Sequence, residues 1–360
     1  MKVYNFSAGP AMLPEEVMIK AQEEFCNYGG TQCGILELSH RGPQFMDVLA
    51  TAKQNIRDLM NINDDYEICF VQGGASMQFA MIPMNFLAAD GVADYADSGT
   101  WSKKAIQEAQ RFGKVNIIGS SKETNYDRIP VVRHWEPSKN ASYLHITSNN
   151  TIAGTQYHTF PPVTAGVPMI ADMSSDFMSR VIDINDFGMV YGGAQKNLGP
   201  SGVALVIIRK DLAARGNKEI PTLLRYGTYI DKDSMFNTPP TFAIYLLKLV
   251  TDWMKAQGGL VMIEEINNTK SEALYELLDG SDFYRSPVEP GSRSKMNIVF
   301  RLPSEELEAK FIKEAGKKGM SGLKGHRSVG GIRASIYNAM PIAGVEALID
   351  FMIQFEKDNG

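Results

Sequence analysis

The sequence predicts an α/β fold: a large domain with a mainly parallel seven-stranded sheet covered by helices, and a smaller α+β domain at the C-terminal end. Seven short apolar runs recur between about residues 67 and 208. Most are separated by segments with helical spacing, which is the alternation of a doubly wound sheet. After residue 240 the pattern changes to long helices around one alternating run.

The seven apolar runs are the expected strands of the large sheet. In chain order they are YEICFV (66–71), VADYAD (92–97), KVNIIG (114–119), SYLHIT (142–147), PMIADM (168–173), MVYGG (189–193) and VALVII (203–208). A segment such as Trp101 to Phe112 supplies a helix between two of them. The last two runs are too close for an intervening helix, so an antiparallel pair is the alternative for them.

The downstream segments predict helices at 241–258, closed by Gly258, and at 260–280, closed by Gly280. A strand with one covered face follows at 295–302, then a helix that begins at Ser304 and a terminal helix at 344–357. We therefore expect a large domain at 15–257 and a small domain at 258–360. The N-terminal segment 1–14 is expected to pack near the small domain.

Composition excludes several classes of protein. The formal charge of −5 disfavours a general nucleic-acid binder, which needs a basic face. No apolar stretch approaches the roughly 20 residues that cross a bilayer, and no secretory signal is present, so a cytoplasmic location is expected. Cys26, Cys33 and Cys69 form no CxxC pair, which argues against disulfides and zinc and predicts small buried apolar residues.

Lys196, in YGGAQKNLGPSG, is the first candidate for chemistry. A single lysine in a loop is usually a solvated cation, and neither a Walker A motif nor GxGxxG is present. Here glycines allow close backbone approach, and the end of a strand in such a sheet faces the ligand crevice. A partly desolvated lysine can lose its proton and bind an aldehyde covalently.

An aldehyde cofactor such as pyridoxal phosphate (PLP) needs a carboxylate, a phosphate cup and a flat partner for its ring. Asp172, at the end of PMIADM, is the candidate carboxylate, with a turn cap as the alternative. QGGASMQF, residues 72–79, leads from a strand into a helix and is the candidate anion cup, although a tight turn would look the same. Trp101 is the candidate ring partner or, alternatively, a core residue.

Together these motifs resemble the class V aminotransferases, and within them the phosphoserine aminotransferase family, which has the PLP fold type I. The resemblance covers essentially the whole chain, and its motifs occur in the family's order. They are FSAGPAMLP, LSHRG (38–42), GGAS (73–76), SNNTIAGTQ (148–156), ADMSS, GAQKNLGPSG, SMFNTPPTFAIY (234–245) and KGHRSVGGIRASIYNAM (324–340).

The resemblance implies a role for each matching residue. Lys196 is expected to bind PLP covalently and to move the proton at the substrate Cα, and Asp172 to pair with the pyridine nitrogen. The remaining cofactor contacts implied are Trp101 on the ring, Thr151 on the 3-oxygen, Ala75, Ser76 and Gln195 on the phosphate, and Asn237 and Thr238 reaching that phosphate from the neighbouring subunit of a homodimer. Some family members have arginine where this chain has Ser76.

Five basic residues are concentrated in this acidic protein, and two Gly-flanked His-Arg pairs, SHRG and GHRS, contain four of them. Surface salt bridges are the alternative explanation. Arginine matches carboxylate and phosphate groups bidentately, and histidine adapts to either. Arg333 is expected to bind the α-carboxylate. The candidates for the distal anion are His40, Arg41, His326 and Arg327.

The resemblance implies transamination between L-glutamate and 3-phosphohydroxypyruvate, giving O-phospho-L-serine and 2-oxoglutarate. A related four-carbon phosphorylated oxo acid of pyridoxine biosynthesis stays open as a substrate. A desulfurase or lyase of the same class needs a late reactive cysteine, and the chain has none after Cys69. An aminotransferase for small donors has little use for five basic groups, and a non-enzymatic relic would have lost Lys196 or Asp172.

Overall fold

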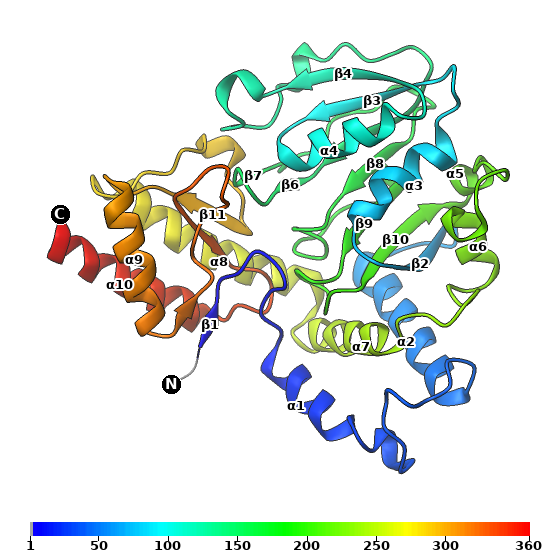
Figure 1. Ribbon diagram of the computed structural model, residues 1–360, viewed down its shortest axis with the longest axis horizontal. Helices are drawn as coiled ribbons and strands as arrows, with labels where there is room; N and C mark the ends of the chain where they lie inside the picture. The colour runs from blue at the N-terminus through cyan, green and yellow to red at the C-terminus, as the bar shows by residue number, and fades with distance from the viewer. Residues whose placement is uncertain (1–2) are drawn as a thin grey trace.

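The computed structural model describes residues 3–360, and its elements gather in two groups (Figure 1). The larger group surrounds a seven-stranded sheet, and the smaller one, at the left of the view, contains the C-terminal helices. The start of the chain joins the smaller group, because β1 (Tyr4–Asn5) pairs in parallel with β12 (Met320–Ser321). Residues 1 and 2 of the expected N-terminal segment lie outside the described residues.

The large sheet contains all seven expected strands. Its order is β2-β10-β9-β8-β5-β3-β4, and only β10 runs against its two neighbours, β2 and β9. The antiparallel pairing of the last two strands is thus confirmed. The strands are β2 (Tyr66–Gln72), β3 (Val92–Asp97), β4 (Lys114–Ser120), β5 (Ala141–Thr147), β8 (Met169–Asp172), β9 (Met189–Gly193) and β10 (Val203–Arg209).

Helices cover both faces of this sheet because its strands bury side chains on both sides. In β2, Ile68 and Phe70 face one apolar core, and Cys69 and Val71 face the other. The first core also contains residues of α1 (Glu15–Glu24), α2 (Pro43–Met60) and α7 (Thr241–Ala256). The second core contains residues of α3 (Ser76–Phe86), α4 (Thr100–Ala109), α5 (Lys210–Ala214) and α6 (Tyr226–Asp231).

The C-terminal elements enclose a third core, which also includes Phe6. They are α8 (Gly259–Asp279), α9 (Glu305–Lys317), α10 (Ile342–Asn359) and the antiparallel pair β11 (Asn297–Phe300) and β13 (Ile332–Ser335). The Ser304 hydroxyl caps α9 by accepting a hydrogen bond from the Leu307 N–H, as the sequence predicts. Gly258 has a φ of +100° just beyond α7, where the sequence predicts its end.

The expectation that the strand at 295–302 has one covered face is wrong, because β11 is buried on both faces. Ile298 and Phe300 pack in the C-terminal core. On the other face, Asn297 accepts a hydrogen bond from Asn149 in β6 (Asn149–Asn150), and Val299 packs beside Gly154, just before β7 (Thr155–Gln156). The second face of β11 is thus covered by the loops that follow the large sheet.

The cysteine prediction is only partly right. Cys69 is buried, but Cys26 is exposed and Cys33 is partly exposed, because the segment after α1 lies at the surface. All three thiols are free, and residues 3–360 contain no group of three metal-ligating side chains. No helix within the same range is long and apolar enough to cross a membrane. The short 3-10 turns are Tyr28–Gly30, Lys122–Thr124, Val132–His134, Ile184–Asp186, Thr222–Leu224 and Pro290–Ser292.

Candidate active site

A cavity of about 370 Å³ opens where strands of the large sheet end. Asp172 is the last residue of β8, and Lys196 follows β9. Trp101 and Ser76 lie at the starts of the helices that follow β3 and β2. Because the carboxyl ends of parallel strands meet at one sheet edge, residues distant in sequence share this cavity. Among its lining residues are Ala75, Ser76, Trp101, Thr151, Asp172, Gln195, Lys196, His326 and Arg333.

Lys196 forms part of the cavity wall, and its ammonium group is held by Thr151. Its Nζ donates a hydrogen bond of 2.6 Å to the Thr151 hydroxyl and lies 5.9 Å from the centre of the Trp101 ring. Burial lowers the pKa of Lys196 to about 8, with the Asp172 carboxylate opposing the change and Arg333 adding to it. A substantial fraction of the amine is therefore neutral just above neutral pH, the state in which it is nucleophilic.

Asp172 is buried, with 5% of its surface exposed. Burial raises its pKa, while hydrogen bonds from Ser174 and the charge of Lys196 oppose the rise. The Ser174 N–H and hydroxyl both donate to Oδ1, at 2.9 and 2.6 Å. These two contacts fix the orientation of the carboxylate toward the cavity.

The segment before α3 has the features of an anion cradle. Gly73 has a φ of +91°, which turns the chain from β2 into the helix, and no side chain caps the helix. Within residues 3–360, the backbone N–H groups of Gly74, Ala75 and Ser76 donate to no acceptor. Gln195 closes the other side, and its buried Oε1 has no hydrogen-bond partner. Free N–H groups at the positive end of a helix dipole favour a phosphate.

Arg333, on β13, and His326 bring positive charge to the cavity from the smaller group of elements. Arg333 Nη1 donates to the Thr151 carbonyl at 3.3 Å, whereas its buried Nε has no partner. His326 has a lowered pKa, caused by burial and then by the charges of Arg333, Arg327 and Lys104. Both residues can therefore meet an anion that enters between the two groups.

Five of the predicted site residues do not line this cavity. His40 and Arg41 lie in the loop before α2, Arg327 is exposed, and none of them is among the lining residues. Asn237 and Thr238 contact Gln72 instead, whose Nε2 donates to the Asn237 side chain at 2.8 Å and to the Thr238 carbonyl at 3.3 Å. The structure thus brings nine of the predicted site residues together and leaves these five outside the cavity.

Sequence reasoning missed several residues at the cavity. Ser174 lines it and orients Asp172. Asn197 is buried next to Lys196 in the chain, outside the lining, and accepts a hydrogen bond from the Asn338 N–H at 3.0 Å. Gly9 also lines the cavity, and a Cβ there would lie 3.5 Å from Lys196 Cγ. FSAGP was noted as a motif, and its glycine was the available signal for this close approach.

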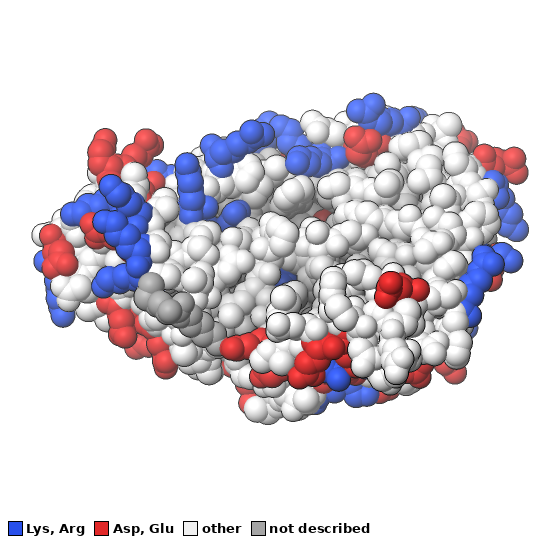
Figure 2. Space-filling model, turned by 60° about the horizontal axis from the view of Figure 1, so that its bottom comes forward, with Lys and Arg blue, Asp and Glu red and all other residues white. Residues whose placement is uncertain are grey.

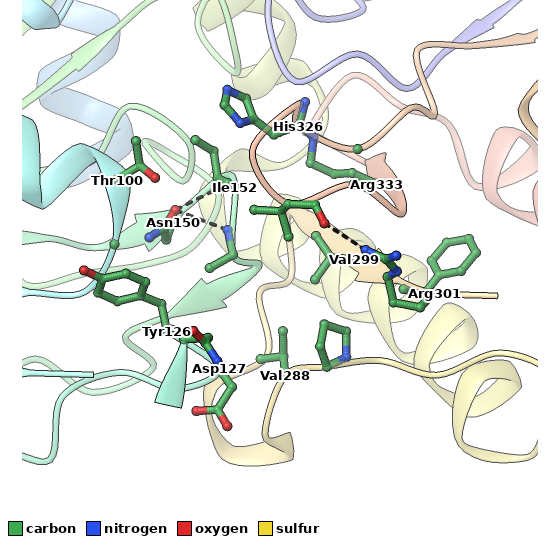
Figure 3. A pocket seen from close by; sticks show the side chains of 18 of the residues that line it. Thr100, Tyr126, Asp127, Asn150, Ile152, Val288, Val299, Arg301, His326 and Arg333 are labelled. Carbon is green, nitrogen blue, oxygen red and sulfur yellow. Dashed lines mark hydrogen bonds between the residues drawn. The ribbon is translucent and has the colours of Figure 1, made fainter. Parts of the chain in front are cut away.

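A second cavity of about 320 Å³ adjoins the first, and Ile152, His326 and Arg333 line both (Figure 3). Figure 3 shows Arg301 and Val299 on the side formed by the C-terminal elements, and Tyr126 and Asp127 on the opposite side. The Asn150 side chain accepts from the N–H groups of Ile152 and Ala153, at 3.1 and 3.3 Å, which fixes the wall between the cavities.

Residues 3–348 match the family model of the aminotransferases of class V. The chain is 48% identical over 359 residues to a phosphoserine aminotransferase of Pseudomonas aeruginosa, covering 100% of this chain and 99% of the relative. It is 52% identical over 359 residues to a phosphoserine aminotransferase of Halalkalibacterium halodurans, covering 99% of each.

Solved structures agree with these relatives. The phosphoserine aminotransferase from Bacillus circulans subsp. alkalophilus superposes with a TM-score of 0.98 at 49% identity, over 100% of this chain and 99% of that one. The PLP-bound phosphoserine aminotransferase from Trichomonas vaginalis gives 0.94 at 37% identity, over 98% and 100%. The chain therefore belongs to the class V aminotransferase family.

Proposed function

We propose that the protein transfers an amino group between L-glutamate and 3-phosphohydroxypyruvate, giving O-phospho-L-serine and 2-oxoglutarate. The observation that carries this proposal is the cavity in which Lys196, Asp172, the anion cradle at the start of α3 and Arg333 meet. The phosphoserine aminotransferases at 48% and 52% identity support the choice of substrate.

The residues present fit PLP, the cofactor of this family. The free N–H groups of residues 74–76 suit its phosphate, and the buried carboxylate of Asp172 suits its pyridine nitrogen. Trp101 offers its ring as a flat partner 5.9 Å from the Lys196 amine, and Thr151 offers a hydroxyl for the 3-oxygen. When bound, PLP accepts the electrons left behind at the substrate Cα.

Lys196 accepts and donates the proton at the substrate Cα in this proposal. With a pKa of about 8, the amine exchanges protons readily near neutral pH, as a general base and acid must. Thr151 accepts its hydrogen bond at 2.6 Å and so holds Nζ on the side of the cavity that faces Trp101. Asp172 lines the same cavity, and the two hydrogen bonds from Ser174 hold its carboxylate in place.

Arg333 binds the α-carboxylate that glutamate and phosphoserine share. Its partnerless Nε and the nearby His326 leave donors for an incoming anion. The distal group is a carboxylate in one substrate and a phosphate in the other, so cationic donors serve both. His40, Arg41 and Arg327 supply further donors in this proposal, although His40 and Arg41 must then come from a second subunit.

A homodimer accounts for the residues that lie outside the cavity. Asn237 and Thr238, like His40 and Arg41, would reach the site of the partner chain. Figure 2 shows one face with few charged side chains in its middle and most of them at the rim. Large apolar side chains are exposed on α1, in the loop after it and on α2 and α3, as a dimer interface requires. They include Met18, Ile19, Phe25, Leu36, Met46 and Met77.

We also propose the finer assignments that follow from this function. The protein acts in the cytoplasm, and residues 15–257 and 258–360 form its large PLP-binding domain and its small domain. The third apolar core, formed by C-terminal residues together with Phe6, supports this division. The same cationic pocket suits a four-carbon phosphorylated oxo acid, which would extend its role to pyridoxine biosynthesis.

The first test is the absorbance spectrum of the purified, PLP-loaded protein, before and after addition of each amino donor. We expect a visible cofactor band that bleaches with L-glutamate and, in a separate sample, with O-phosphoserine. L-alanine is the control for a donor without a distal anion. Bleaching by glutamate alone would contradict the phosphorylated substrate, and the absence of a band after PLP is supplied would contradict the role of Lys196.

A further inference from the structure

The turn at 325–331 carries His326 to the edge of both cavities and is closed by its own backbone. The His326 carbonyl accepts hydrogen bonds from the Val329 and Gly330 N–H groups, at 2.9 and 2.8 Å. The Gly325 N–H donates to the Gly331 carbonyl at 2.9 Å, so the two ends of the turn are joined. His326 Nδ1 lies 2.7 Å from the Ser328 hydroxyl, which leaves Nε2 as the ring nitrogen not engaged by the turn.

Two charged side chains from other elements form hydrogen bonds with the backbone of this turn. Arg301, which follows β11, donates from Nη1 to the Val329 carbonyl at 2.8 Å. Glu308, in the first turn of α9, accepts a hydrogen bond from the Gly331 N–H at 3.1 Å. Arg301 Nε lies 2.7 Å from Glu308 Oε1, an ion pair that does not meet hydrogen-bond geometry. The pair therefore holds the C-terminal part of the turn, at Val329 and Gly331.

The packing leaves little freedom between Arg301 and the turn. Gly330 and Gly331 have φ values of +76° and +73°, a backbone conformation that favours glycine. A Cβ on Gly331 would lie 2.7 Å from Arg301 Cδ, and one on Gly330 would lie 3.1 Å from Arg301 Nη1. Glu308 is 6% exposed, so water does not screen its charge well. The two glycines allow the guanidinium to lie directly against the backbone of the turn.

We propose that Arg301 and Glu308 are positioning residues for the distal-anion pocket. Arg301 holds Val329, whose N–H donates to the His326 carbonyl, and Glu308 holds Gly331, whose carbonyl accepts from the Gly325 N–H. Together they fix the backbone of His326 and thereby the direction of its Nε2. The inference rests on the proposed function, since it assigns these residues to recognition of the substrate's phosphate or carboxylate. It differs from direct binding, in which the guanidinium of Arg301 itself would meet the anion.

The experiment measures the half-reaction of PLP-loaded protein with O-phosphoserine, by the loss of the cofactor band at increasing donor concentration. The variants are Arg301→Met and Glu308→Gln. The matched control is Arg293→Met, because Arg293 pairs bidentately with Asp279, at 2.7 and 2.6 Å, away from the turn. Hydrogen exchange of the 325–331 amides is measured on the same samples.

We expect Arg301→Met to raise the half-saturating phosphoserine concentration about tenfold while the maximal rate changes by less than about threefold. Glu308→Gln should raise it in the same direction, since one amide oxygen cannot serve both Gly331 and Arg301. Both variants should speed exchange in the turn. Arg293→Met should lower thermal stability and leave the half-saturating concentration and the exchange unchanged.

Two results would overturn the inference. One is an unchanged half-saturating concentration in Arg301→Met. The other is an effect in Arg301→Met that is absent in Glu308→Gln, which indicates that the guanidinium binds the anion directly, because Glu308→Gln retains the arginine. A wild-type protein that does not react with O-phosphoserine would instead contradict the proposed function, and the exchange measurement would still test whether the pair holds the turn.

Discussion

Replacing Lys196 with methionine should stabilise the cofactor-free protein at pH 7. Burial lowers the pKa of the amine from its ordinary value of 10.5 to about 8, so the charged form is disfavoured in the folded state. At 1.36 kcal/mol per pKa unit, the cost at pH 7 is about 3 kcal/mol. Methionine removes that cost and also loses the hydrogen bond to Thr151, which is about 1 kcal/mol. Because water can enter the cavity, we expect a net gain of about 1–2 kcal/mol.

The pH dependence of this gain identifies its cause. Well below pH 8, Lys196 is protonated in both states and the full penalty is present; it begins to fall as the pH approaches the folded-state pKa of about 8. Between pH 8 and 10.5 the unfolded chain binds more protons than the folded one, so the stability contributed by Lys196 rises with pH. The advantage of Lys196→Met should therefore be largest near pH 7 and absent by about pH 9.5.

The measurement is urea unfolding of both proteins, freed of PLP by a carbonyl reagent, at pH 7 and pH 9.5. Fluorescence and circular dichroism should give coincident transitions. Lys104→Met is the control, since this exposed cation lies 4.5 Å from the same Trp101 ring, and its free energy of unfolding should change by less than about 0.5 kcal/mol. A destabilised Lys196→Met, or a gain that is equal at both pH values, would refute the reasoning.

Three further predictions concern residues around the cavity and its support. Asp172→Asn should retain a folded protein but lower the rate of both half-reactions at least 100-fold, because the buried charge that faces the cofactor is lost. Stopped-flow absorbance measures these rates, and near-normal values would contradict the assignment. Arg333→Lys keeps the positive charge but loses the planar guanidinium that binds a carboxylate bidentately, so the half-saturating concentrations of glutamate and phosphoserine should both rise about tenfold. An effect on only one donor would place Arg333 at the distal anion. Lys270→Met should lower the free energy of unfolding, because the buried Nζ donates to three carbonyls in 336–340 at 2.9–3.0 Å and methionine leaves all three without a donor. Burial lowers the pKa of Lys270 to about 7, so methionine also removes a desolvation penalty, and the net loss should be only about 1–2 kcal/mol. Calorimetry showing no loss of stability would contradict this role.

The strands were predictable from local pattern, but their arrangement was not. Each of the seven apolar runs became a strand because buried β-strands need continuous apolar sequence. The position of β10 at the side of β2 depends on pairing with a segment far earlier in the chain, whereas its other neighbour, β9, precedes it directly. β11 was read as half-covered because KMNIVFRL alternates between polar and apolar residues, yet hydrogen bonds with Asn149 and Ser335 allow the polar Asn297 to be buried.

The candidate site was predictable where a residue follows a strand directly. Lys196, Asp172, Trp101 and Ser76 all lie at or just beyond strand ends, and one sheet edge collects them. Ser174 and Asn197 were missed because a short polar side chain beside a functional residue has no distinctive sequence pattern. Cys26 was expected to be buried, and its exposure shows that residue type alone does not determine burial at a loop.

By itself, the sequence determined which residues reach the end of each strand, and hence that a lysine, a carboxylate and a free helix start lie at one edge. These follow from local periodicity and from the geometry of parallel sheets. Only the tertiary structure decided that Arg333 and His326 join Lys196, and that Arg301 and Glu308 hold the turn beneath His326. Arg333 and His326 lie more than 100 residues after Lys196 in the chain, and the contacts of Glu308 depend on its burial. Both features are set by how the two groups of elements pack.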